Sequence, residues 1–109
     1  MPGGRLQKGE SLADGLCREV YEEVGLHIHN LEPFALWDWI LPQQNGCIRV
    51  IAAAHYCCSD DASPSLEHQE PDDYIDRCEW VPVAELSKYE FIPDFVPIIQ
   101  IFLKKYFDL

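Results

Sequence analysis

Basic residues are scarce in this sequence. Lysine and arginine together number 8, against 19 aspartates and glutamates, which gives a formal net charge of −11. Because a chain of this charge repels a phosphate backbone, we expect no general nucleic-acid binding. An anionic small molecule would need a local device to bind, such as a cation, a basic patch or a helix N-terminus.

Long apolar runs and paired cysteine motifs are also lacking. No stretch approaches the roughly 20 apolar residues that cross a membrane, and residues 1–5 lack the apolar segment of a signal peptide. The cysteines number 5, an odd count, and none forms a C-x-x-C pair, which argues against a disulfide framework and a zinc ribbon. We therefore expect free thiols, no membrane association and a cytoplasmic protein.

What is present indicates one folded domain over residues 1–109. Apolar residues make up 48% and charged residues 25%, fractions typical of a globular domain. The richest polar stretch, residues 59–73, separates two apolar regions and predicts a long surface loop.

A helix is predicted between Ser11 and Gly25. Ser11 is a good N-cap, and Asp14 three residues later makes a weaker form of the capping box. Gly25 follows the last apolar position, where a glycine in the left-handed conformation ends a helix. The apolar residues between them recur at four-residue spacing and predict one stripe: Leu12, Leu16, Val20 and Val24.

Two strands are expected after this helix, at residues 34–41 and 47–58, the second apolar enough to be a central strand. The Asn-Gly pair at residues 45–46 between them is a hairpin signal. A short strand is predicted at residues 78–81, followed by a helical turn at 83–86. The last helix is expected from about residue 93 to 107, with Pro97 tolerated in its first turn.

Three glutamates share one face of the predicted first helix. Glu19, Glu22 and Glu23 stand three and four residues apart, so they lie in adjacent turns. Like charges this close destabilise an empty helix, and a divalent cation such as Mg²⁺ or Mn²⁺ would reverse that effect. The plainer alternative is a solvated acidic face.

The surroundings of these glutamates favour the cation site. The pair Gly3-Gly4 precedes the helix and lets the backbone approach a ligand closely. Glu10 lies eight residues before Arg18, and the two side chains are expected to pair. Arg18 would then support the glutamate face and offset part of its charge.

These residues resemble a known motif. The pattern G-x5-E-x7-R-E-U-x-E-E-x-G-U, with U an apolar residue, is the Nudix box. Every specified position is matched over residues 4–26, and the sequence therefore resembles the Nudix hydrolase family. The matching residues are Gly4, Glu10, Arg18, Glu19, Val20, Glu22, Glu23, Gly25 and Leu26.

The resemblance implies an α/β fold, an α/β/α sandwich with a mixed sheet. It also implies an enzyme that hydrolyses the diphosphate bond of a nucleoside diphosphate linked to another moiety. Glu19, Glu22 and Glu23 resemble the ligands of Mg²⁺ or Mn²⁺, together with the carbonyl of Gly3 or Gly4. Glu22 and Glu23 are the catalytic candidates, and Arg18 and Glu10 resemble the pair that orients the glutamates.

The general base varies within the family, between a box glutamate and an acid of a later loop. The loop candidates are Glu67, Glu70, Asp72 and Asp73, with Glu70 and Asp73 preferred; an ordinary surface role is the alternative for each. Candidates for substrate binding are Arg5, Trp37 and Trp39. The tryptophans would stack on a nucleobase, and a core or interface position is their alternative.

One feature departs from the family. Its members carry strands of the central sheet before the box, whereas the box here begins at residue 4. We therefore expect an N-terminally truncated version of the fold. A truncated product, a misassigned start and a homodimer that completes the sheet remain open. The alternative function is a truncated, non-catalytic module that binds a nucleotide or a protein.

Overall fold

The computed structural model describes residues 1–71 and 73–109. The chain divides into two compact units. The first comprises Met1–Leu31 and Cys57–Lys88, and the second comprises Glu32–Tyr56 and Tyr89–Leu109. Each unit draws on two separate parts of the chain.

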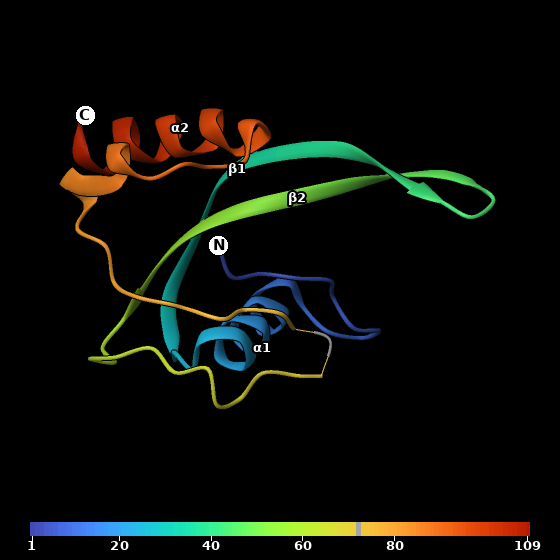
Figure 1. Cartoon of the computed structure of the whole chain (residues 1–109), viewed down its shortest axis with the longest axis horizontal. Coiled ribbons are helices and arrows are strands. Elements are labelled where there is room, and N and C mark those ends of the chain that lie inside the picture. The colour runs from blue at the N-terminus through green and yellow to red at the C-terminus, as the bar shows by residue number, and fades with distance from the viewer. Residues whose placement is uncertain (72) are drawn as a thin grey trace. The chain divides into compact units, whose positions relative to one another are not determined.

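Helix α1 (Leu12–Val24) of the first unit begins and ends where the sequence predicts (Figure 1). The Ser11 hydroxyl accepts a hydrogen bond from the backbone N–H of Asp14 at 3.1 Å, so it serves as the N-cap. Gly25 ends the helix in the left-handed conformation, with φ of 71°, and its N–H donates to the carbonyl of Tyr21.

The apolar stripe of α1 forms the core of the first unit, with one exception. Val20 and Val24 are buried with Leu26, and three partly buried side chains pack against them: Leu16, Ile28 and Cys78. The prediction was wrong for Leu12, which is 49% exposed. It stands in the first turn of α1, at the far end of the stripe from the buried residues.

The hairpin is longer than the sequence predicts. Strand β1 (Ile28–Gln43) and strand β2 (Gly46–Ser59) pair in a two-stranded antiparallel sheet, and the Asn-Gly signal lies at their turn (Figure 1). In the described part of the chain β2 has β1 as its one neighbour, so the expectation of a central strand was wrong. Apolar composition indicates burial on both faces, which a strand in a two-stranded sheet does not have.

The second unit is built on aromatic packing between the hairpin and the last helix. A 3-10 turn, η2 (Pro93–Phe95), leads into α2 (Val96–Phe107), with a proline in the first turn of α2 as predicted. Tyr56 of β2 stacks on Tyr106 with ring centroids 4.2 Å apart, and Phe34 of β1 contacts Phe102 at 6.0 Å. Ile98, at 4% exposure, is the buried residue of this helix.

The short strand expected at residues 78–81 was wrong: these residues form no regular structure. A strand needs the hydrogen bonds of a neighbouring strand, and the sheet of the described residues contains β1 and β2 alone. The predicted helical turn follows as the 3-10 helix η1 (Val83–Lys88). Among the described residues, neither α1 nor α2 has the length and apolar content needed to cross a bilayer.

We predict that Gly25→Ala destabilises the protein more than Gly9→Ala does. Both glycines have positive φ, 71° and 80°, which costs an alanine about 1 kcal/mol. A Cβ at Gly25 would also lie 2.9 Å from the backbone oxygen of Ser65, whereas a Cβ at Gly9 meets nothing within 4 Å. Urea unfolding should show a loss of about 1 kcal/mol for Gly9→Ala and at least about 2 for Gly25→Ala. Equal losses would contradict the contact with Ser65.

Candidate functional site

The guanidinium of Arg18 lies at the centre of the acidic face of α1. Its Nε and Nη2 atoms donate a pair of hydrogen bonds to the Glu10 carboxylate, at 2.7 and 3.0 Å. Its Nη1 atom donates to Glu19 and Glu22, at 2.9 and 3.1 Å. Nη2 also donates to the carbonyl of Arg5, at 3.1 Å. The five N–H groups of the guanidinium are therefore all engaged.

The predicted pairing of Glu10 with Arg18 is confirmed. The hydrogen bond from Arg18 is the main cause that lowers the pKa of Glu10 below its ordinary value, and the backbone N–H of Gln7 adds a second, at 2.9 Å. Hydrogen bonding to Glu10 in turn raises the pKa of Arg18. Both groups stay charged at neutral pH, so Arg18 ties the loop before α1 to the helix face.

Glu23 differs from its neighbours because its side chain is buried. The residue is 8% exposed, and the backbone N–H of Gly3 donates to its Oε1 atom at 3.2 Å. Burial raises the pKa of Glu23 to about 7, the Gly3 hydrogen bond opposes that rise, and the nearby Glu19 and Asp73 add to it. Glu23 therefore holds its proton up to near neutral pH.

The loop after β2 brings two further acids to this face. Glu70 and Asp73 line an open pocket of about 410 Å³ together with Glu19 and Glu22, within the size range of ligand sites. The other lining residues are Gln7, Arg18 and Pro71. Glu67, a third predicted candidate, does not line it, and Asp72 lies outside the described residues.

The donors of this site suit a divalent cation in their chemistry. Mg²⁺ and Mn²⁺ prefer carboxylate and carbonyl oxygens, and Glu23 is a buried carboxyl that forms no ion pair in the described part of the chain. Within the same residues, no three acidic, histidine or cysteine side chains converge closely enough to hold one ion. Arg18 contacts one oxygen atom of Glu19 and one of Glu22.

The backbone before α1 lies against the glutamates. A Cβ at Gly4 would lie 2.5 Å from the carboxyl carbon of Glu19, so the absent side chain permits this approach. Gly3 presents its N–H to Glu23, whereas the sequence singled out its carbonyl as a ligand. Arg5 contributes its carbonyl to Arg18, and its side chain is exposed.

Trp37 and Trp39 belong to the second unit and are half-buried. Their rings stack on each other with centroids 6.2 Å apart, and Trp37 also meets the edge of Phe95 at 5.5 Å. Trp37 thus packs between Trp39 and Phe95 of η2.

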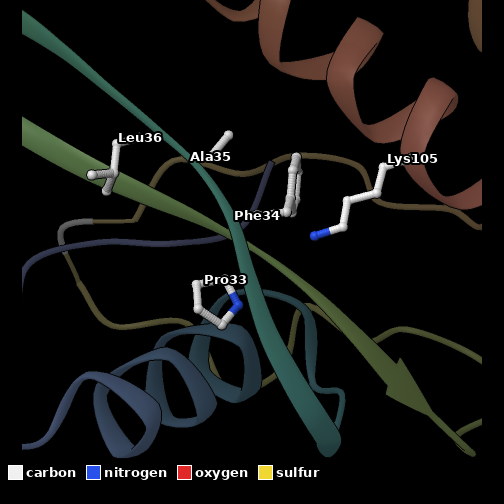
Figure 2. A pocket seen from close by; sticks show the side chains of 5 residues that line it. All are labelled: Pro33, Phe34, Ala35, Leu36 and Lys105. Atoms are coloured by element: carbon white, nitrogen blue, oxygen red, sulfur yellow. The ribbon is translucent and has the colours of Figure 1, made fainter.

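A second hollow, in the second unit, is lined by four residues of β1 and by Lys105 of α2 (Figure 2). The Lys105 side chain reaches from α2 toward Phe34, and its Nζ atom forms an ion pair with Glu32 at 3.2 Å. The other residues that line the hollow are apolar or aromatic: Pro33, Phe34, Ala35 and Leu36. With its one cation already paired, this hollow offers no chemistry comparable to the acidic pocket.

Sequence reasoning missed three residues that shape the acidic pocket. Gln7 and Pro71 line it, and the side chain of Gln69 bonds across the loop that carries Glu70 and Asp73. None of them belongs to a motif, and a glutamine in a polar loop carries no signal of a distant backbone partner.

We predict that the metal-free protein loses stability as the pH rises, through Glu23. Because its pKa is raised from 4.5 to about 7 on folding, the folded state binds the proton more tightly than the unfolded state does. The loss therefore begins near pH 4.5 and is complete above pH 7. With a chelator present, the stability of Glu23→Gln relative to wild type should rise by about 3 kcal/mol between pH 4.5 and pH 7.

Urea unfolding across this pH range measures the difference. The matched control is Glu90→Gln, because Glu90 is exposed, and its difference from wild type should not change with pH. If Glu23→Gln and wild type show the same pH dependence, the carboxyl of Glu23 does not hold the proton near neutral pH.

Comparisons with known proteins identify the family of this chain. Residues 1–102 match the NUDIX domain. Phosphatase NudJ of Shigella boydii serotype 4 (strain Sb227) is 29% identical over 87 residues, 80% of this chain and 53% of that protein. Phosphatase NudJ of Escherichia coli K12 is 28% identical over 85 residues, 78% of this chain and 52% of that protein. The chain thus spans about half the length of these curated relatives.

The fold also has a solved counterpart. A structure from work on MutT of Aliivibrio salmonicida and Vibrio cholerae matches with a TM-score of 0.59 and 24% identity, over 94% of this chain and 73% of that one. This likeness confirms the α/β fold class that the box predicts. With a domain match over nearly its whole length, the chain belongs to the NUDIX domain family.

Proposed function

We propose that this chain is a metal-dependent nucleotide pyrophosphatase. It would hydrolyse the diphosphate bond of a nucleoside diphosphate linked to another moiety, with Mg²⁺ or Mn²⁺ as cofactor. Membership of the NUDIX family supports this reaction class, because Nudix hydrolases generally use divalent metals. The similarity to proteins named phosphatase NudJ supports phosphate chemistry in general.

The observation that carries the proposal is the state of Glu23. A carboxyl that is 8% exposed, lies beside Glu19 and has a pKa of about 7 destabilises the protein when it ionises. A solvated acidic face would have no reason to bury one of its carboxyls. A divalent cation would favour the ionised form and remove that cost.

In the proposed site, some residues would bind the cation and others would orient the residues that bind it. Glu19, Glu22 and Glu23 would hold the cation, with the Gly3 carbonyl as a backbone ligand. Arg18, fixed by Glu10, would orient Glu19 and Glu22, since its Nη1 atom contacts both at 2.9 and 3.1 Å. When bound, the cation would neutralise the diphosphate and acidify an attacking water. An acidic protein could then bind an anionic substrate.

We propose that the general base is one of four acids. Glu22 and Glu23 are the candidates on α1, and Glu70 and Asp73 are the candidates on the loop that lines a pocket together with Glu22. Arg5, which is exposed and follows the glycine pair, is proposed to contact substrate phosphate. Trp37 and Trp39 remain the candidates for stacking on a base. The five cysteines are free thiols, which supports a reducing cytoplasm as the place of action.

We predict that Glu23→Gln abolishes hydrolysis while leaving the protein folded. Amide for carboxylate keeps the shape of the side chain and removes a proposed ligand, so kcat should fall at least about a hundredfold. The measurement is phosphate release from a panel of nucleoside diphosphate derivatives with Mg²⁺, coupled to a phosphatase. Glu90→Gln, at an exposed position, should keep wild-type activity.

The same assay separates the alternative function. If the folded wild-type chain releases no phosphate from any substrate, yet a nucleotide raises its melting temperature, the chain is a non-catalytic nucleotide-binding module. If hydrolysis survives Glu23→Gln unchanged, the assignment of the site to α1 is wrong.

We also propose a homodimer that completes the sheet. Each strand of a two-stranded sheet has one open edge, and Leu36 and Ile51 of the hairpin are 73% and 70% exposed in the chain alone. Sedimentation velocity over a hundredfold range of concentration should give a species of twice the monomer mass. A single monomer throughout that range would contradict it.

A further inference from the structure

The loop that follows β2 contacts α1 at two points, Ser65 and His68, which precede Glu70 and Asp73. The backbone N–H of Ser65 donates to the carbonyl of Val24 at 2.7 Å, at the C-terminal end of the helix. The ring of His68 stacks on Tyr21 with centroids 4.5 Å apart, and its Nε2 atom lies 3.3 Å from the Tyr21 hydroxyl. The loop therefore enters the site from a defined position on α1.

The side chain of Gln69 forms hydrogen bonds across the loop, to Leu66 and to Ile75. Its Nε2 atom donates to the carbonyl of Ile75 at 2.9 Å, and its Oε1 atom accepts from the N–H of Ile75 at 3.1 Å. This is the exchange of two hydrogen bonds that a residue of a neighbouring strand would make. A further contact from Nε2 reaches the carbonyl of Leu66 at 3.4 Å. One side chain thus joins residues on both sides of the acids.

Glu70 and Asp73 are joined by two hydrogen bonds in the part of the loop between Gln69 and Ile75. The N–H of Asp73 donates to the carbonyl of Glu70, and the N–H of Glu70 donates to Oδ2 of Asp73, both at 3.0 Å. One oxygen of Asp73 is therefore occupied by the turn itself. Both acids nevertheless line the pocket that Glu19 and Glu22 line from α1.

We propose that Gln69 is a positioning residue for the cation site: its amide closes the loop and holds Glu70 and Asp73 against the glutamate face of α1. The inference rests on the proposed function, because it assigns the loop acids to the same cation. Four carboxylates around one pocket repel one another when no cation is bound, and the loop can relieve this by moving away. The hydrogen bonds of the Gln69 amide with Ile75 oppose this movement.

The chemistry of the contact explains why the residue is a glutamine. Ile75 offers one donor and one acceptor, so its partner must supply both, which an amide does and a carboxylate does not. Asparagine is one methylene shorter. The neutral amide also adds no further charge beside four acids.

The test is binding of Mn²⁺ alone, followed by electron paramagnetic resonance, to the full chain without nucleotide. Gln69→Ala should weaken Mn²⁺ binding about tenfold and change the spectrum of the bound ion, because the residues behind metal ligands contribute on this scale. Gln69→Met, which keeps the length of the side chain, should do the same if Gln69→Ala folds poorly. Gln100→Ala, an exposed glutamine of α2, is the matched control and should bind as wild type does.

A double-mutant cycle separates positioning from general loosening of the structure. In an Asp73→Asn, Glu70→Gln background, the loop keeps neither of the two carboxylates that line the pocket, so adding Gln69→Ala should cause no further loss of Mn²⁺ affinity. A tenfold loss that persists in this background would overturn the proposal. Wild-type affinity in both Gln69 variants would overturn it as well, as would a wild-type chain that binds no Mn²⁺.

This outcome is distinguishable from failure of the proposed function. If wild type binds Mn²⁺, the Gln69 variants weaken it and the cycle shows coupling, the inference holds even where no nucleotide derivative is hydrolysed. If hydrolysis is found but the Gln69 variants bind Mn²⁺ as wild type does, the function stands and the role of Gln69 falls.

Discussion

The site depends on one guanidinium in a strongly acidic chain. Arg18 contacts Glu10, Glu19 and Glu22 at 2.7 to 3.1 Å, and it is the one positive group in each of these ion pairs. Without it, the face of α1 would present like charges in adjacent turns, which destabilise a helix. Because the contact with Glu10 crosses from the preceding loop to the helix, the same side chain fixes the approach of the chain to α1.

The carboxyl groups on this face of α1 differ in what compensates their charge. Glu19 and Glu22 are partly compensated by Arg18, whereas Glu23 is turned into the protein and holds a proton near neutral pH. A proton and a cation would thus compete for the same oxygen atoms. This makes the buried carboxyl the residue at which occupancy of the proposed site and protonation are linked.

The local features could be predicted from the sequence. The limits of α1 follow from Ser11 and Gly25, whose signals act within one turn of the helix, and the pairing of Glu10 with Arg18 follows from the spacing of the box. Features that depend on partners elsewhere in the chain could not be predicted from the sequence. Residues 78–81 have a strand-like composition but do not join the sheet of β1 and β2.

The same distinction holds within the site. The glutamates of α1 belong to a motif, and the helix places them in adjacent turns, as their spacing requires. The partner of Gln69 lies six residues away across an irregular loop, at an interval that no helix or strand periodicity marks. The exposure of Leu12 likewise depends on where the packing of the first unit ends, which hydrophobic spacing does not report.

The hydrogen bond from Ser65 to Val24 has a consequence for how this region opens. The carbonyl groups in the last turn of a helix lack partners within the helix, and here the loop supplies one for Val24 at 2.7 Å. If the loop lifts away, this carbonyl loses its donor and the end of α1 frays with it. The acidic loop and the last turn of α1 therefore form one cooperative unit, whose backbone amides would exchange with solvent through a shared opening event.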